Sequence, residues 1–479
     1  MNILDYSKKV IKLSLVRVFS RIKRVFEGIM SFIGIQCMLS FSLLRNTKII
    51  LSSPFLIDLK FYIRHMHFYY TVPKYPSFES RKYYKKIAHI YEQSNVSYQN
   101  GDWETTKAFL LEAEEIKQNF LIDSGFDSKI RLIDQEITSS LGHMAISLSL
   151  RAQNNILYPE CSLDYVVLSG SSVNEAYLSL WRKYFNFIET SKFEGRVIGR
   201  SLWKISESAQ TAPVGKTYLP LNDAFNALTV AWENNHHSPL LNLNDEISYA
   251  GEEWSKKNGI GDFDWFVTLH VRNSIQNLRG YGRNANIMSY VPAIKEIINS
   301  GGFVIVIGDN KQSKELPRIN GLIDYSSTSS KNAKLDTYFL ARNRFLIATT
   351  SGPLNVPITF GKPILATNAP DLGKFVYYPG SLMVPKLAVN KQGEVLSYNE
   401  MLSSKVGWTD SYVNPDFFWR DNSEDEIKYA VREMLQIDDK YLQDSNTEVS
   451  LYKSILKNHS ANPSTEMSRY FLNKWKSLL

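Results

Sequence analysis

Apolar runs alternate with amphipathic stretches through the middle and the C-terminal part of the chain. Each run is short and is followed by glycine or polar residues, which is the pattern of strands buried in a parallel sheet. The predicted strands are Tyr165–Leu168, Trp265–Arg272, Phe303–Ile307, Gly321–Tyr325, Arg344–Ala348 and Pro363–Ala366. Helix-like segments separate them, such as Ile287–Asn299 and the stretch that begins at Ser351 and runs to Phe360. The sequence therefore predicts an α/β fold.

The same pattern divides the chain into regions. Residues 131–264 and 265–440 are predicted to form two consecutive α/β domains, followed by C-terminal helices over 441–479. Residues 71–130 are predicted to be helical, because proline is absent and glycine rare in their central part. The spacing of Tyr98, Gly101 and Trp103 resembles a single tetratricopeptide hairpin. One such hairpin cannot bury a solenoid core alone, so we expect it to pack on a larger domain.

Charge is spread unevenly along the chain. The 479 residues are 44% hydrophobic, which excludes a mainly disordered protein, and carry a net charge of +7. Residues 1–70 hold 11 Lys and Arg against three acids, whereas the remaining residues hold 44 against 45. Because the body of the protein is nearly neutral, we expect no nucleic-acid partner.

The basic N-terminal segment, residues 1–70, also contains apolar stretches. Residues 28–44 lack charge, but 17 residues are at the short limit for a helix that crosses a bilayer, and serines and a glutamine interrupt them. Residues 10–24 combine an apolar face with lysines and arginines, as in a helix that lies in anionic headgroups. Peripheral attachment to the inner face of the cytoplasmic membrane is the favoured interpretation. The alternative is a basic, exposed first helix.

The cysteines indicate a reducing compartment. The chain has two, Cys37 and Cys161, of which Cys37 lies in the apolar stretch, so neither a structural disulfide nor a zinc pattern is expected. A cleavable secretory signal does not fit, because the apolar stretch starts late and no clear cleavage site follows. We therefore expect a cytoplasmic protein.

Polar residues follow the predicted strands at the end where ligands bind in doubly wound sheets. We expect them to converge on one ligand site; they are His270, Arg272, Gly308, Asp309, Tyr325, Thr350, Ser351 and Asn368. Ser351-Gly352-Pro353 has the residues of a helix start, whose free N–H groups favour an anion. Arg272, Arg279 and Arg283 supply planar donor groups suited to a diphosphate. Together these residues predict a nucleotide diphosphate site.

A resemblance appears in the same strings. LHVR at 269–272, SGGFVIVIGD at 300–309, RFLIATTSGP at 344–353 and FGKPILATN at 360–368 resemble, in that order, a bacterial glycosyltransferase family. That family is similar in motif order to fucosyltransferase-like enzymes of GT-B architecture. The Leu141-Gly142-His143 turn, the segment 173–178 and the helix Ser423–Met434 are similar to its other landmarks. Unlike the fucosyltransferase-like pattern, no acid follows shortly after Arg272.

The resemblance implies sugar transfer from a nucleotide sugar by two Rossmann-like domains that face a cleft, behind an N-terminal helical region. It implies a nucleotide-sugar donor as substrate, no separate cofactor, and a glycan or lipid-linked acceptor in bacterial surface polysaccharide biosynthesis. Arg272 and the Ser351 helix start would stabilise the leaving diphosphate without metal. His143 would face donor or acceptor across the cleft, or instead be a turn histidine bonded to backbone. Asp309, Asp324 and Asp336 are candidate bases, and we place Asp309 in the predicted catalytic set with Arg272 and His143.

Other motifs weaken rival functions. Asp262-Phe263-Asp264 is a DxD string, but it precedes a strand in a glycine-containing linker rather than following one, so we expect no metal site. His236-His237 lie in a predicted loop without ligand spacing. Walker A, HExxH and GxSxG motifs do not occur in the sequence. The remaining alternatives are a nucleotide-sugar epimerase or hydrolase of similar form, and a catalytically degenerate scaffold that binds sugar nucleotides.

Overall fold

A computed structural model describes most of the chain beyond residue 79. The described residues are 80–479 except 101, 124–126, 171, 192–205, 236–237, 274–280, 309–310, 375–377, 405–416, 437–445, 459–463 and 465. All of them belong to one compact unit, Val72–Leu479. The predicted membrane-associating segment 1–70 lies outside the described residues. Within them, every helix is too short or too polar to cross a membrane.

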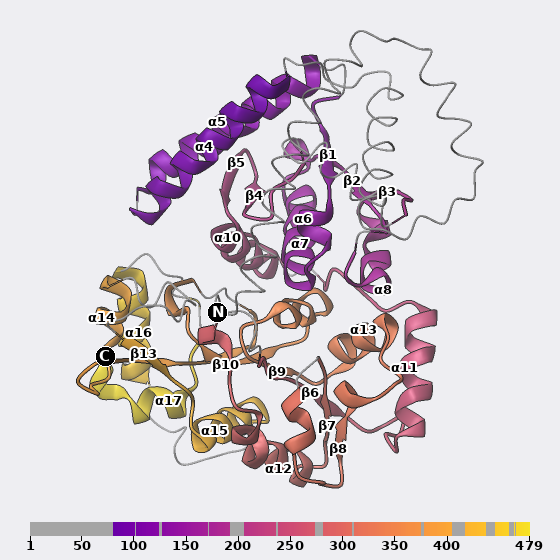
Figure 1. Ribbon diagram of the computed structural model, residues 1–479, viewed down its shortest axis with the longest axis vertical. Helices are drawn as coiled ribbons and strands as arrows, with labels where there is room; N and C mark the ends of the chain where they lie inside the picture. Colours follow the sequence, from indigo (N-terminus) through magenta and orange to yellow (C-terminus); the bar gives the residue numbers. More distant parts are fainter. Residues whose placement is uncertain are drawn as a thin grey trace, which may run out of the picture. The chain divides into compact units, whose positions relative to one another are not determined.

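The first described elements are two long helices, α4 (Ser80–Gln99) and α5 (Trp103–Asp123). They lie side by side as a hairpin (Figure 1). Its small apolar core consists of Ile87, Ile90, Ala113 and Ile116. At the turn, the rings of Tyr98 and Trp103 meet edge to face with centroids 5.0 Å apart. The predicted helical region is therefore present as a hairpin.

The hairpin leads into the N-terminal lobe, which we define as residues 127–234. Its parallel sheet has the order β1-β2-β3. The elements of the lobe are β1 (Ile130–Ile133), α6 (Gln135–Thr138), α7 (Leu141–Leu157), β2 (Asp164–Leu168), α8 (Glu175–Ser179), β3 (Asn186–Ile188), β4 (Thr211–Val214), β5 (Thr217–Pro220) and α10 (Leu221–Asn234). The antiparallel pair β4–β5 contacts both α5 and α10. In this way the helical hairpin is joined to the lobe.

The helix α11 (Asp245–Lys257) precedes the C-terminal lobe, residues 265–479, which contains a six-stranded sheet. Its strands are β6 (Phe266–His270), β7 (Phe303–Val306), β8 (Leu322–Asp324), β9 (Leu346–Ala348), β10 (Ile364–Ala369) and β11 (Leu382–Pro385). They are all parallel and lie in the order β11-β10-β9-β6-β7-β8. Read in chain order, this is the 3-2-1-4-5-6 arrangement of a doubly wound Rossmann sheet.

β6, which is an apolar run in the sequence, lies between β9 and β7 in the middle of this sheet. All five of its residues are buried, as expected for a strand covered on both faces. The helices are α12 (Val291–Asn299), α13 (Ala333–Arg342) and α15 (Glu424–Met434). α12 packs on α15, and α13 packs on α11. The β6–β7 crossover through α12 and the β8–β9 crossover through α13 run in opposite directions along the sheet, so right-handed connections place the two helices on opposite faces (Figure 1).

The rest of the C-terminal lobe packs at the β11 edge. It comprises β12 (Leu387–Asn390), α14 (Tyr398–Ser403), β13 (Phe417–Arg420), α16 (Asn446–Asn458) and α17 (Arg469–Lys474). The Ser468 amide donates to the Met383 carbonyl, so the C-terminal segment extends the sheet beyond β11. α15 begins with a capping box between Ser423 and Glu426.

The expected α/β class with two Rossmann-like lobes is confirmed by these parallel sheets. Three local predictions are wrong. The Leu141-Gly142-His143 turn is the first turn of α7, and the helix predicted from residue 287 begins as a 3-10 turn and becomes α-helical only at Val291. The helix predicted after Ser351 is two 3-10 turns, η7 (Gly352–Asn355) and η8 (Pro357–Phe360). Pro357 lacks the amide hydrogen that a continuous α-helix would need at this position, whereas Pro353 lies in the first turn, where no intrahelical donor is required.

Candidate functional site

The candidate site lies where the strand order of the C-terminal sheet reverses. β6 pairs with β7 on one side and with β9 on the other, and the chain continues outward in both directions. At such a switch point, the loops that leave the two central strands diverge and leave room for a ligand at their carboxyl ends. The ends concerned are those of β6, at His270, and β9, at Ala348.

The residues at these two ends hydrogen-bond to one another. The Thr349 amide donates to the His270 carbonyl at 3.2 Å, and the Arg272 amide donates to the Thr349 hydroxyl at 2.9 Å. The His270 Nε2 lies 3.1 Å from the Ser351 hydroxyl. The predicted residues His270, Arg272 and Ser351 therefore meet at one place, although they are far apart in the sequence.

Gly308 lies against the His270 ring. Its φ is +96°, and a Cβ at this position would come within 2.6 Å of His270 Nδ1. Only glycine leaves room for the ring in this backbone conformation. The Lys331 Nζ donates to the Gly308 carbonyl at 2.9 Å, which adds a cation to this edge that the sequence analysis missed. Asp309, the adjacent predicted catalytic residue, lies outside the described residues.

Arg272 and Arg283 are brought together by the backbone. The Ala285 amide donates to the Arg272 carbonyl at 3.0 Å, so the chain returns to the end of β6 directly after Arg283. Both arginines are half-buried. Arg279 lies outside the described residues. Two of the three predicted arginines are therefore placed at the switch point.

The Ser351–Gly352 segment differs from the predicted helix start. The Ser351 hydroxyl makes no capping bond and instead contacts His270, and the turn that follows has four residues. A short 3-10 turn has few aligned peptide dipoles, so its N-terminus is a weaker anion site than that of a long helix. Thr350, the preceding residue, has its hydroxyl 3.5 Å from the Asp371 carboxylate.

Two other predicted binding residues have structural partners. Tyr325 is fully buried between Trp254 and Phe339, and its hydroxyl accepts a bond from the Asn332 amide. Asn368 is in a left-handed conformation, with φ of 52°, at a bulge in β10. It exchanges two hydrogen bonds with Asn422, of 2.6 and 2.8 Å, and its amide nitrogen donates to Tyr290. Both therefore hold elements of the lobe together.

The N-terminal lobe reaches the switch point through the start of α7. A Cβ added to Gly142 would lie 3.0 Å from the Gly352 Cα, so the two backbones touch. His143 follows Gly142 and is half-buried, and the resemblance assigned it to this place. Because α7 follows β1, the carboxyl ends of both sheets meet here.

The carboxylates considered as bases or metal ligands have other contacts. Asp324 accepts a bond from Ser326, and Asp336 lies in the first turn of α13. Asp262 pairs with Lys256 at 3.2 Å, and Asp264 accepts the Gly261 amide at 2.7 Å in an exposed turn. Among the described residues, no group of three His, Cys, Asp or Glu side chains could hold a metal ion.

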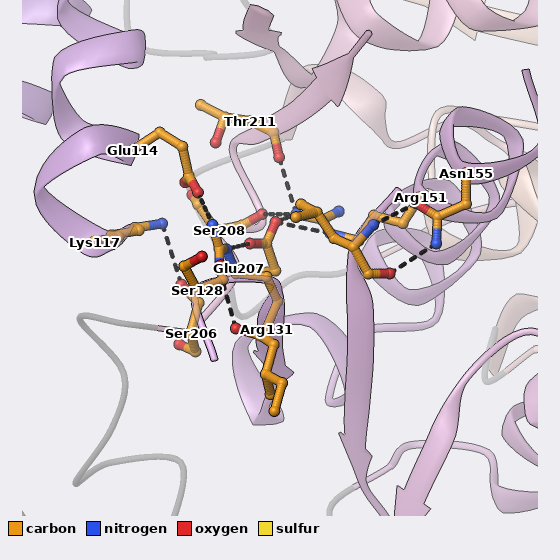
Figure 2. A network of polar contacts seen from close by, with 12 residues as sticks. Glu114, Lys117, Ser128, Arg131, Arg151, Asn155, Ser206, Glu207, Ser208 and Thr211 are labelled. Atoms are coloured by element: carbon orange, nitrogen blue, oxygen red, sulfur yellow. Dashed lines mark hydrogen bonds and ion pairs between the residues drawn. The ribbon is translucent and has the colours of Figure 1, made fainter. Parts of the chain in front are cut away.

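A second polar cluster lies inside the N-terminal lobe (Figure 2). Glu207 accepts two hydrogen bonds from Arg151, of 3.0 and 2.7 Å, and its other oxygen lies 3.6 Å from Arg131. Arg131 also pairs with Glu114 of α5. Lys117, from the same helix, donates to the Ser206 carbonyl at 3.3 Å. Each of these five charged residues is at most 3% exposed, so the cluster is internal and joins the helical hairpin to the sheet.

The surroundings favour the ionised carboxylate of Glu207 but the protonated carboxyl group of Asp134, which is bonded to the Ser206 hydroxyl next to the cluster. Burial alone would raise the pKa of Glu207, but the cations of Arg151, Lys117 and Arg131 lower it below its usual value. Burial raises the pKa of Asp134 to about 6, and hydrogen bonds from Glu136 and Ser206 oppose this only in part. The cluster leaves no signal in the sequence, because each of its charges looks like an ordinary surface charge there.

Comparison with known proteins gives a distant likeness only. No family model and no curated protein matches the sequence. Among solved structures, the chain is similar to a glycosyl transferase family 9 protein from Veillonella parvula DSM 2008, with 12% identity, 64% of this chain and 97% of that chain covered, and a TM-score of 0.41. It is also similar to E. coli ADP-heptose lps heptosyltransferase II, with 12% identity, coverage of 64% and 98%, and a TM-score of 0.40. Likenesses at this level do not extend those proteins' activity to this chain.

Proposed function

We propose that this protein is a metal-independent glycosyltransferase of GT-B type. It would transfer a sugar from a nucleotide-sugar donor to a glycan or lipid-linked acceptor in bacterial surface polysaccharide biosynthesis. The observation that carries the proposal is the switch point of the C-terminal sheet. There Arg272 and the His270–Ser351 pair lie at the carboxyl ends of β6 and β9, in contact with α7 of a second α/β lobe.

The chemistry of the residues fits this reaction. Sugar transfer breaks the bond to a diphosphate, on which negative charge develops in the transition state. The guanidinium of Arg272 would neutralise that charge. Arg283 would assist it, because it stands two residues before Ala285, whose amide donates to the Arg272 carbonyl. Three of the strings that resemble the glycosyltransferase family, 269–272, 300–309 and 344–353, include the carboxyl end of a strand in this sheet, and the fourth, 360–368, stops one residue before the end of β10. This placement supports a donor site on the C-terminal lobe.

The acceptor would bind on the side of the N-terminal lobe. His143 lies on α7 next to the Gly142–Gly352 contact, where it could contact acceptor or donor, or take a proton from the acceptor hydroxyl. Asp309 stays a second proposed base. In this assignment the catalytic set is Arg272, His143 and Asp309, and both lobes contribute to it.

The test is transfer of a radiolabelled sugar from a panel of nucleotide sugars to membrane-extracted lipid-linked glycans. The proposal predicts label in the glycan fraction with the wild type and its loss with Arg272→Ala. Arg344→Ala is the matched control, since Arg344 lies at the amino end of β9 and stacks on Trp265 at 4.6 Å. Label that appears only as free sugar or as an isomerised nucleotide sugar would favour a hydrolase or an epimerase. Nucleotide binding without turnover would favour the scaffold.

We further propose that the basic N-terminal segment attaches the protein to the inner face of the cytoplasmic membrane. The support is its local excess of 11 Lys and Arg over three acids beside apolar stretches. Flotation with vesicles that contain anionic phospholipid tests this attachment. The full chain is expected to float, and a chain without residues 1–60 is expected to stay in the soluble fraction. A full chain that does not float at low salt would contradict the proposal.

A further inference from the structure

Lys386 is a buried cation next to the candidate site. It follows β11, the last strand of the C-terminal sheet, and is 3% exposed. Its Nζ donates to the Asn284 carbonyl at 2.7 Å and pairs with the Asp421 carboxylate at 2.5 Å. A buried ammonium is costly unless such partners are present. Burial lowers the pKa of Lys386, and Asp421 opposes this shift.

The Asn284 carbonyl belongs to the segment that returns to Arg272. Asn284 stands between Arg283 and Ala285, whose amide donates to the Arg272 carbonyl at 3.0 Å. The Arg272 amide is itself bonded to Thr349 at the end of β9. A contact that holds Asn284 therefore also holds the backbone of both arginines of the switch point.

Asp421, the other partner of Lys386, is attached to the sheet through its neighbour. Asn422 exchanges hydrogen bonds with Asn368 of β10, and its amide nitrogen donates to the Pro385 carbonyl at 2.8 Å. Asn422 is 3% exposed, so these bonds are shielded from water. The backbone that carries the Asp421 carboxylate is therefore held against β10 and β11.

We propose that Lys386 and Asp421 form a positioning pair, which fixes the 283–285 segment so that Arg272 and Arg283 are held in place for the donor's diphosphate. This inference rests on the proposed function. Binding and catalytic groups need placement to within about 0.5 Å, and side chains on a returning segment reach that accuracy only when their backbone is tied to rigid elements. In this assignment both residues act through the backbone of the 283–285 segment and neither contacts the substrate; Lys386 is 3% exposed, and two of its three donors are engaged within the protein.

The first arm of the test does not depend on activity. Peptide-resolved hydrogen exchange over residues 281–290 is compared for the wild type, Lys386→Met and Asp421→Asn. Methionine keeps the length of the buried stem, and Asp421 is 45% exposed, so water can solvate the carboxylate that is left. We expect exchange in this peptide to speed up about tenfold in Lys386→Met and less in Asp421→Asn, which keeps an acceptor oxygen. Lys256→Met, from the exposed pair with Asp262, is the control and should leave the peptide unchanged.

The second arm measures calorimetric affinity for nucleoside diphosphates. We expect Lys386→Met to weaken binding about tenfold, and Lys386→Arg to restore at least part of it, because a guanidinium can also reach two acceptors. A purely structural lysine would lower the melting temperature without this rescue of affinity.

The outcomes separate the two proposals. Unchanged exchange over 281–290 in Lys386→Met overturns the positioning pair whatever the protein binds. Faster exchange together with wild-type affinity also overturns it, while the proposed function stands. A wild type that binds no nucleoside diphosphate overturns the proposed function, and with it the role of the pair in donor binding. The exchange arm then shows separately whether the pair holds the segment.

Discussion

The N-terminal lobe pairs its buried charges with one another, whereas the C-terminal lobe also places cations beyond the ends of its strands. Arg131, Arg151 and Glu207 are at most 1% exposed, and the Glu207 carboxylate pairs with both arginines. In the C-terminal lobe Lys386 is likewise buried and paired with Asp421, but Arg272, Arg283 and Lys331 are half-buried beyond the strand ends. Charges that are satisfied internally specify packing, while charges held at a switch point are placed to meet a ligand. This difference supports the proposal that the donor site lies on the C-terminal lobe.

The largest effect should follow from opening the buried cluster. Glu207→Ala would leave the buried Arg151 guanidinium without its carboxylate partner and Arg131 with Glu114 alone, so we expect a loss of about 3–5 kcal/mol in the free energy of unfolding. Urea unfolding measures it. Glu189→Ala, which breaks the exposed pair of Glu189 with Arg182, is the control and should change little. A small loss for Glu207→Ala would show that the N-terminal charges are not a stability element, and the contrast between the lobes would fail.

A second test sharpens the comparison through pH. Because the pKa of Asp134 is raised from 3.8 to about 6, the folded protein holds a proton between these values that the unfolded chain has lost. Its contribution is therefore fully present below pH 4 and is lost as pH rises through 6, by about 3 kcal/mol. Asp134→Asn keeps an acceptor for the Glu136 amide and removes this slope. The difference in unfolding free energy between variant and wild type should grow in favour of the variant from pH 4 to 7. A difference that is constant with pH would contradict the burial of Asp134.

A third test concerns the contact between the lobes. In Gly142→Ala the new methyl would lie 3.0 Å from the Gly352 Cα, which is backbone and cannot rotate away. We expect a net stability change of only about 1 kcal/mol, because alanine favours the helix, but about a tenfold loss of sugar transfer. Gly352→Ala approaches the same contact from the other side, 3.2 Å from the Gly142 nitrogen, and should behave alike. Wild-type transfer in both variants would mean that the lobes do not act together.

The smallest effect is expected at the DxD string. Asp262 and Asp264 lie in an exposed turn, where they bind Lys256 and the Gly261 amide. The double variant Asp262→Ala, Asp264→Ala should transfer sugar within about twofold of the wild type, and activity should persist in excess EDTA. Complete loss on chelation, restored by magnesium or manganese and reproduced by the double variant, would overturn the metal-independent proposal.

The C-terminal lobe could be predicted from the sequence because its pattern is local. β6, β7 and β9 are apolar runs followed by polar residues or glycine, and such strands place their ends at one edge of the sheet. This was enough to bring His270, Arg272, Gly308 and Ser351 together before the fold was known. The α-helix predicted after Ser351 is absent because Pro357, which follows the helix-start pattern, cannot donate an intrahelical hydrogen bond.

The rest depends on pairings that leave no local trace. Arg151 and Glu207 are 56 residues apart, and Asn368 and Asn422 are 54 apart. Charged and amide residues are usually exposed, so a single sequence gives no sign that these four are buried together in pairs. The burial of Lys386 leaves no local trace either. In addition, β11, the short strand before it, ends in proline, which is atypical of a buried strand.

The most direct test of the central claim is calorimetric titration of UDP, GDP, ADP, dTDP and CMP against the wild type, Arg272→Ala and Arg344→Ala. Arg272 lies at the carboxyl ends of the central strands and Arg344 at their amino ends, so the two variants compare the two ends of the same strands. We predict that one nucleoside diphosphate binds the wild type and Arg344→Ala alike. Arg272→Ala should bind it at least about tenfold more weakly, because it loses a charge-assisted contact worth about 1.5–3 kcal/mol. Equal affinity in all three proteins, or no binding to any of them, would contradict a donor site at the carboxyl end of β6.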